Sequence, residues 1–390
     1  MFSSRLPAVL GPNAVSRTTD TLRASGAILL DLTLSNPSEA AISYPPDLLS
    51  SLADPRGLQY TPHPQGLEAA REAVAAGYRR QGVDVGSGQV FLTASTSEAY
   101  ALLFKLLADP GDHVLVPQPG YPLFELLTRL EAVVATPYSL EYHGRWSIDR
   151  SSLEQALTPR TRAILIVSPN NPTGSMLRAA DRDWLVELGA ARNIALISDE
   201  VFSDYRLAAR SDAVSLAGEP GVLTFALGGL SKSAGLPQLK LAWIAASGPA
   251  ALVADARTRL DVICDTYLSV STPVQLAAPA LLETGRTIRQ AIQSRITRNL
   301  AHLRTEAARH PAVTLLDPEA GWSAVLRVPA TMSEEALVLR LAEEAGVLVH
   351  PGYFFDFPSE AWLVISLLPE PAILDEGISR LLRLVTGRAH

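Results

Sequence analysis

The stretch GGLSKSAGLPQLKLAW, residues 228–243, holds two of the three lysines of a chain that also has thirty arginines. These two lysines are Lys232 and Lys240. An amine differs from a guanidinium because it readily loses a proton, attacks a carbonyl carbon and forms a covalent Schiff base. The loop around Lys232 therefore raises the hypothesis of amine chemistry at this point of the chain.

Four other polar stretches each follow a short apolar run. ASTS (94–97) follows QVFLT, QPGY (118–121) follows HVLVP, SPNNPTG (168–174) follows AILIV, and Asp199 follows ALIS. In open α/β sheets, ligands bind outside the carboxyl ends of the strands. If the runs are parallel strands, the groups that follow them meet at one edge of the sheet. These groups are hydroxyls, an aromatic ring, an amide, a carboxylate and an amine.

Each of these stretches also has an ordinary structural interpretation. Ser and Thr at a helix start are common N-caps, an acid at a strand end can belong to a structural ion pair, and SPNNPTG can be only a turn. Five such groups at five strand ends favour a ligand instead. The set matches pyridoxal phosphate, which needs an amine for its aldehyde, an acid for its pyridine nitrogen and a helix N-terminus for its phosphate.

The elements that must position these groups form two patterns. Apolar runs alternate with helical periodicity in the middle of the chain, which predicts an α/β fold with a mostly parallel central sheet and helices on both faces. The last hundred residues predict a smaller α+β domain. We expect a large domain over 41–285 and a small domain built from 1–40 and 286–390. The expected strands are 89–93, 113–117, 163–167, 195–198, 222–227, 324–328 and 362–367, and the expected helices are 97–108, 123–130, 181–192, 288–308 and 334–344.

Bulk properties exclude several classes of protein. A net charge of −7 argues against a nucleic-acid binder. No apolar run is long enough to predict a membrane span. The single cysteine, Cys264, excludes an internal disulfide framework and a cysteine-based zinc site, and we expect no metal. A cytoplasmic protein is the expectation.

From about Asp31 to Leu384, the chain resembles the class I/II aminotransferases, which are aspartate-aminotransferase-like pyridoxal-phosphate enzymes of fold type I. SPNNPTG and the SK loop carry the resemblance. It implies a homodimer with shared active sites that moves an amino group between an amino acid, or an amine, and a keto acid. It also implies that Lys232 forms the Schiff base and shuttles the proton.

The resemblance assigns further residues to the cofactor. Asp199 is expected to pair with the pyridine nitrogen, Asn171 to bond the ring oxygen and Tyr121 to stack on the ring. Tyr60 is expected to reach the phosphate held by the partner subunit. The remaining expected cofactor contacts are Ser95, Thr96, Ser97, Phe202, Ser231 and Lys240.

The chain departs from the family pattern at four positions. Phe202 replaces a common tyrosine, Gly229 a serine and Lys240 an arginine. Val364 stands where the family has the arginine that holds the substrate α-carboxylate, and a lost bidentate pair is worth roughly 2–4 kcal/mol. Either another group binds the carboxylate or the substrate lacks one there. Candidates for the substrate pocket are Asn36, Trp322 and Tyr353, and candidate replacement arginines are Arg17, Arg145 and Arg206.

The same cofactor residues serve several reactions. A C–S β-lyase, a decarboxylase or a racemase is the alternative to an aminotransferase, because all of them use the same electron sink. A non-catalytic module that only binds pyridoxal phosphate is a further, weaker alternative.

Overall fold

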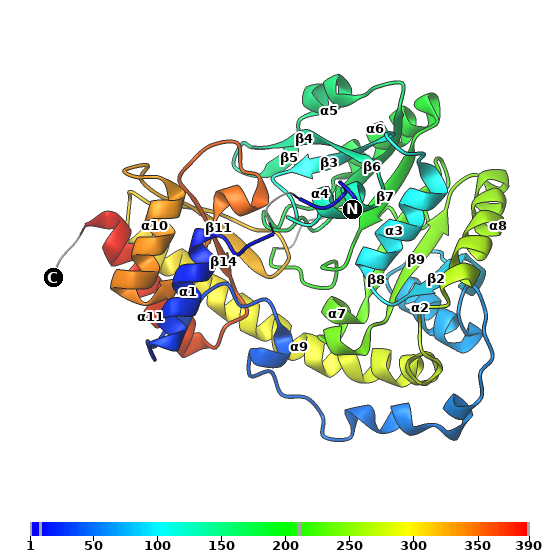
Figure 1. Cartoon of the computed structure of the whole chain (residues 1–390), viewed down its shortest axis with the longest axis horizontal. Helices are drawn as coiled ribbons and strands as arrows, with labels where there is room; N and C mark the ends of the chain where they lie inside the picture. Colours follow the sequence, from blue (N-terminus) through cyan, green and yellow to red (C-terminus); the bar gives the residue numbers. More distant parts are fainter. Residues whose placement is uncertain (1, 8–9, 209–211, 388–390) are drawn as a thin grey trace.

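A computed structural model describes residues 2–7, 10–208 and 212–387. It contains a large part built on an eight-stranded sheet and a smaller part. The smaller part includes the first helix, α1 (Ala14–Ala24), and the last helix, α11 (Pro371–Thr386). The long helix α9 (Thr272–Ala308) runs along both parts (Figure 1).

The central sheet has the strand order β2-β9-β8-β7-β6-β3-β4-β5. The five strands from β8 to β4 are parallel to their neighbours, whereas β9 and β5 join antiparallel. The prediction of a mostly parallel sheet is confirmed. The strands are β2 (Val90–Thr93), β3 (His113–Gln118), β4 (Val134–Tyr142), β5 (Trp146–Ile148), β6 (Thr161–Val167), β7 (Ala195–Asp199), β8 (Thr224–Gly229) and β9 (Ala242–Ser247).

Apolar side chains cover both faces of this sheet. Val114 and Leu165 pack into one buried cluster, while their chain neighbours Leu115 and Ile164 pack into the cluster on the other face. This alternation is the period-two geometry of a strand. The first cluster includes residues of α3 (Thr96–Leu107), α4 (Phe124–Leu130) and α8 (Ala250–Tyr267), and the second those of α5 (Arg150–Ala156) and α6 (Ala179–Arg192).

The smaller part is an antiparallel sheet with helices. Its strand order is β10-β11-β14-β13, and β1 (Leu30–Asp31) pairs in parallel with β12 (Val347–Leu348), so the beginning of the chain is fixed to its end. This agrees with the expected α+β character. The other elements are β10 (Thr314–Leu316), β11 (Ser323–Arg327), β13 (His350–Pro351), β14 (Trp362–Ser366), α2 (Glu68–Arg80), α7 (Leu230–Ser233) and α10 (Glu334–Arg340).

Helix α9 begins sixteen residues before the expected start at residue 288. Pro279 lies inside it, and a proline normally ends a helix because it has no N–H to donate. The expected domain boundary at residue 285 falls within this continuous helix, so the division into 41–285 and 1–40 with 286–390 stays a prediction. Over the described residues, no helix combines the length and apolarity needed to cross a bilayer.

Candidate functional site

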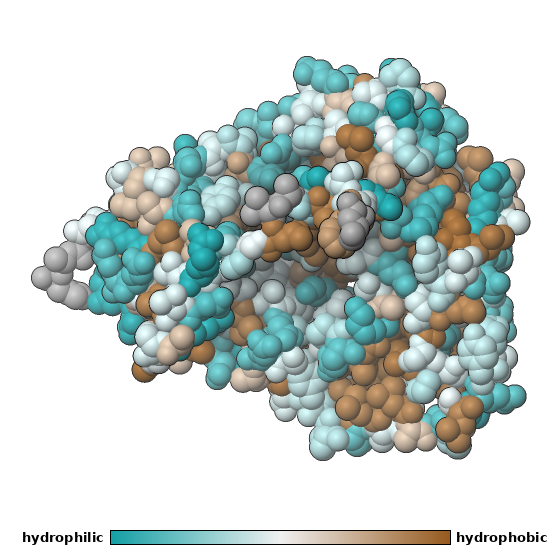
Figure 2. Space-filling view, in the orientation of Figure 1, coloured by the Kyte–Doolittle hydropathy of each residue, from teal (hydrophilic) through white to brown (hydrophobic). Residues whose placement is uncertain are grey.

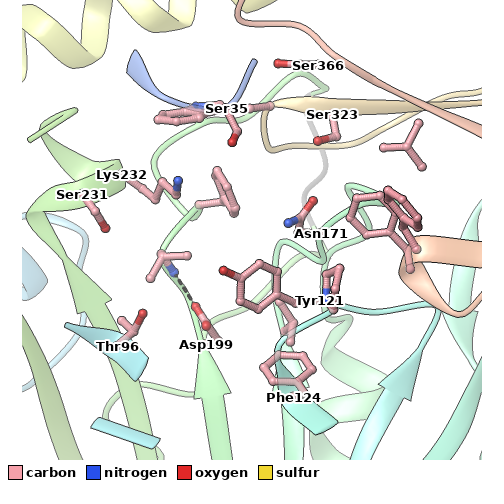
Figure 3. A pocket seen from close by; sticks show the side chains of 18 of the residues that line it. Ser35, Thr96, Tyr121, Phe124, Asn171, Asp199, Ser231, Lys232, Ser323 and Ser366 are labelled. Carbon is pink, nitrogen blue, oxygen red and sulfur yellow. Dashed lines mark hydrogen bonds between the residues drawn. The ribbon is translucent and has the colours of Figure 1, made fainter. Parts of the chain in front are cut away.

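One cavity collects most of the residues singled out from the sequence. It lies where the carboxyl ends of the large sheet face the small sheet, and the surface is hollowed near the centre of the view in Figure 2. In Figure 3, Thr96 and Asp199 lie on one side of it, Ser323 and Ser366 on the other, and Lys232 between them. The cavity is therefore a two-sided site with the lysine amine at its middle.

Lys232 belongs to α7, the short helix that follows strand β8 directly. Its Nζ lies 4.9 Å from the ring centroid of Trp322 and 5.5 Å from that of Phe202. Burial lowers the pKa of the amine to about 8, and the carboxylate of Asp199 opposes part of this change. Nζ makes no hydrogen bond to any residue in the described ranges. A largely desolvated amine with this pKa is a competent nucleophile and proton carrier near neutral pH.

Asp199 is the last residue of β7 and is buried. Its Oδ2 accepts a hydrogen bond from the Tyr100 hydroxyl at 2.7 Å, and its Oδ1 accepts one from the Val201 N–H at 3.1 Å, the dashed line in Figure 3. Burial raises the pKa of Asp199, and these two bonds and Lys232 counteract that rise. Tyr100 was not predicted from the sequence. Its position one helical turn after Thr96 is the signal that could have found it.

Several polar side chains of the cavity have no protein partner. The hydroxyls of Thr96, Ser97, Tyr121 and Ser231 and the amide of Asn171 line it without a hydrogen bond to any described residue. Thr96 and Ser97 open the twelve-residue helix α3, whose free N–H groups favour an anion. This donor set, with a buried acid and a free amine, fits the phosphate, ring and aldehyde of pyridoxal phosphate.

Four predicted site residues lie elsewhere in this single chain. Ser95 is the N-cap of α3 and accepts a hydrogen bond from Glu98 N–H at 3.1 Å. Lys240 is exposed, in a left-handed conformation after a 3₁₀ turn. Tyr60 is 74% exposed and Tyr353 is 42% exposed, and neither lines the cavity.

Asn36 also stays outside the cavity lining, because its amide is already bonded. Its Nδ2 donates to Glu39 at 2.8 Å, and its Oδ1 accepts from Ser38. Its chain neighbour Ser35 lines the cavity instead. Asn36 therefore caps a 3₁₀ turn in this structure, and its expected substrate role, like that of Tyr353, stays a prediction without support from its position.

The second side of the cavity comes from the small sheet and is aromatic and hydroxylic. Trp322 lines it as predicted, and so does Val364, which is 2% exposed. No arginine of the described residues lines the cavity. Arg17 donates to the carbonyl of Pro12, and Arg145 pairs with Asp212, so neither replaces the missing guanidinium. The other lining residues on this side were not predicted from the sequence; they are Thr33, Ser35, Ser323, His350, Phe354, Phe355 and Ser366.

The chain is similar to known proteins over nearly its whole length. The model of the family "aminotransferase class I and II" matches residues 24–381. The alanine aminotransferase of Mycobacterium tuberculosis is 27% identical over 377 residues, which cover 92% of this chain and 86% of that protein. The glutamate–pyruvate aminotransferase of Haemophilus influenzae is 26% identical and covers 94% and 92%.

Solved structures agree on the fold. An aminotransferase from Escherichia coli superposes with a TM-score of 0.88 at 25% identity over 100% of this chain and 99% of that one. The alanine aminotransferase from Pyrococcus furiosus gives 0.89 at 24% identity over the whole of both chains. The chain therefore belongs to the class I and II aminotransferase family, as a pyridoxal-phosphate-dependent aminotransferase of fold type I.

Proposed function

We propose that the protein transfers the amino group of an α-amino acid with an uncharged side chain to a 2-oxo acid, with Lys232 as the reacting amine. The observation that carries this proposal is the state of Lys232: its side chain is half-buried in the cavity, and its Nζ has no hydrogen bond within the described chain and lies beside the rings of Trp322 and Phe202. An amine held in this way is not tied up in a hydrogen bond or ion pair of the described chain, and its pKa of about 8 suits proton transfer.

The residues of the large sheet are suited to hold the cofactor. Asp199 would pair with its ring nitrogen, Asn171 and Tyr121 would contact its ring, and Ser231 with the start of α3 would bind its phosphate. Pyridoxal phosphate supplies an aldehyde that condenses with amines and an electron-poor ring that accepts the electron pair released at the substrate Cα.

Asp199 and Lys232 are the residues whose protonation matters for the reaction. The hydrogen bonds from Tyr100 and Val201 favour the ionised form of Asp199 despite its burial. Lys232, when neutral, takes a proton at Nζ from one carbon and returns it to another. The rings of Trp322 and Phe202 lie 4.9 and 5.5 Å from Nζ and form an apolar wall beside the amine, which favours its neutral form.

The lining of the small-sheet side supports an uncharged donor side chain. Phe354, Phe355 and Trp322 supply apolar surface, and no described arginine is available for a second carboxylate. The names of the relatives, alanine aminotransferase and glutamate–pyruvate aminotransferase, make pyruvate the first acceptor to test.

The test compares two of the three lysines of the chain. Lys232→Ala should lower the rate of amino transfer by about a hundredfold to ten-thousandfold, because it removes the general acid–base group. Lys105→Ala serves as the control and should keep amino transfer, because that lysine is exposed, pairs with Glu131 and does not line the cavity. Rates are read from the cofactor absorbance after mixing with a panel of amino acids.

Two outcomes of this test contradict the proposal. One is continued cycling of the cofactor in the Lys232→Ala protein. The other is release of ammonia from the donor without any keto acid acceptor, which indicates a lyase.

We further propose a homodimer in the cytoplasm. Exposed apolar side chains cluster around one groove: Tyr60 and Leu268 line it, and Leu58, 93% exposed, precedes Tyr60. Such a surface is typical of a subunit interface. The single cysteine, buried Cys264, favours a reducing compartment.

A further inference from the structure

The antiparallel strands of the small sheet bring four residues to one wall of the cavity. The register pairs His350 with Val364 across β13 and β14, and Ser323 with Ser366 across β11 and β14. Residues that pair across antiparallel strands lie on the same face, and Val364 and Ser366, two apart on one strand, share that face as well. All four line the cavity. The position that lacks an arginine thus shares one face of the sheet with three polar side chains.

Two of these three polar side chains have free hydrogen-bonding groups. The imidazole of His350 lies 5.8 Å from the rings of both Phe354 and Phe355, and it makes no hydrogen bond to a residue that the structure describes. The hydroxyl of Ser323 has no partner among the described residues either. The hydroxyl of Ser366, in contrast, donates to the carbonyl oxygen of Leu34 at 2.5 Å. The free donors on this wall are therefore His350, opposite Val364, and Ser323, opposite Ser366.

The surroundings of His350 keep its imidazole mainly neutral. Burial lowers its pKa, and the carboxylate of Asp31 is the charged group that opposes this change. A neutral imidazole still offers one N–H donor. The neighbouring indole N–H of Trp322 is buried and has no partner in the described chain, so this wall carries more donors than its own fold uses.

We propose that His350 and Ser323 bind the α-carboxylate of the amino acid substrate, in place of the guanidinium that position 364 lacks. The donor comes from the adjacent strand rather than from β14 itself, but the register brings it to the same face of the sheet. This inference rests on the proposed function, because it assumes that an amino acid reacts at Lys232. It makes His350 the residue that distinguishes amino acids from simple amines.

The decisive experiment pairs a variant with two donors that differ only in the carboxylate. His350→Phe keeps a ring between Phe354 and Phe355 but removes both nitrogens. For L-phenylalanine, the KM should rise by about tenfold to a hundredfold with little change in kcat, because a hydrogen bond to a charged group is lost. For 2-phenylethylamine, the half-reaction rate should stay within about twofold of the wild type. His350→Gln, which retains an N–H donor, should restore part of the affinity.

A binding measurement on the holoenzyme tests the same inference without turnover. We expect His350→Phe to weaken binding of 3-phenylpropionate by about tenfold, and Ser323→Ala to weaken it by less. Binding of 3-phenylpropanamide, which lacks the carboxylate, should change little in either variant. The control is His143→Phe, which removes an imidazole that is 75% exposed on the surface and should change neither ligand. Cofactor absorbance and the unfolding midpoint verify that each variant is folded.

The outcomes separate this inference from the proposed function. If the wild-type enzyme transfers no amino group but still binds 3-phenylpropionate through His350, the proposed function fails and the carboxylate site stands. If His350→Phe weakens the carboxylate and the amide equally, or neither of them, His350 does not bind a carboxylate and the inference is overturned.

Discussion

At the scale of single residues, the site depends on two ionisable groups, Lys232 and Asp199, whose pKa values are shifted in opposite directions. Burial favours the neutral forms of both Lys232 and Asp199. For the lysine this is useful, because the neutral amine is the reactive form. For the aspartate it is a cost, which the Tyr100 hydroxyl and the Val201 N–H offset by donating hydrogen bonds to the ionised carboxylate.

The role of Tyr100 can be tested with Tyr100→Phe. Without the phenol, the pKa of Asp199 rises further, because a hydrogen bond to the charged carboxylate, worth about 1.5–3 kcal/mol, is lost. Activity that needs the ionised carboxylate is lost as pH falls through this pKa, so the acid limb of kcat/KM should move to higher pH. Tyr138→Phe is the control, because that buried hydroxyl donates to the backbone carbonyl of Leu165 and does not line the cavity. An unchanged acid limb in Tyr100→Phe would show that the phenol does not tune Asp199.

At the scale of elements, the two sides of the cavity are joined by a contact between two loops. The N–H groups of Glu319 and Ala320 both donate to the carbonyl of Gly174 at 3.1 Å. Arg178 and Glu319 form a buried ion pair beside it. These contacts fix the SPNNPTG loop, which carries Asn171, against the segment that leads into Trp322. A backbone contact outside the cavity thus sets the relative position of two residues inside it.

Gly174→Ala tests this junction. Gly174 has a φ of 70°, and an added Cβ would lie 2.5 Å from Cβ of Pro318 and 2.6 Å from the carbonyl oxygen of Ala320. Backbone strain and the clash together should lower the free energy of unfolding by about 2–5 kcal/mol. Gly144→Ala is matched, with a φ of 78° but no atom within 4 Å, and should cost only about 1–2 kcal/mol. Urea unfolding measures both, and equal losses would mean that the junction adds nothing beyond backbone strain.

The sequence predicted the elements whose signals are local. Apolar runs such as AILIV predicted the parallel strands, and the polar residues after them predicted Lys232, Asp199 and Asn171 as neighbours, because the carboxyl ends of parallel strands share one edge. His350 was missed for a physical reason. Its strand, β13, has two residues, which is too short for any periodicity, and only pairing with β14 brings its side chain to the cavity. Tyr100 was missed because it lies among apolar residues of its helix, so the sequence gives no sign of its hydrogen bond to Asp199.

At the scale of the whole molecule, the proposed dimer predicts that subunits complement one another. Tyr60 lies outside the cavity of its own chain, and the resemblance assigns it to the phosphate of the partner subunit. Two variants, Lys232→Ala and Tyr60→Ala, should each have little or no amino-transfer activity when the cofactor is limiting. Unfolded together and refolded as a mixture, they should regain about a quarter of the wild-type activity, because about half of the dimers are mixed and each contains one intact site of two.

The control for this mixture is Lys232→Ala refolded alone, which has no intact site in any pairing. Activity of the mixture that merely equals the average of the two separate variants would contradict shared sites. Sedimentation of the refolded sample verifies that the species measured is a dimer.

The separate origin of the two walls has a consequence for how this enzyme can change its specificity over evolutionary time. The amine, the buried acid and the phosphate donors belong to the large part of the fold, whereas His350, Ser323, Val364 and Trp322 belong to the smaller part. A substitution in the second wall alters which donor is accepted and leaves the hydrogen bonds of Asp199 untouched. New substrates are therefore accessible by single mutations that preserve the underlying chemistry, and a valine at position 364 is tolerated when a neighbouring strand supplies the donor.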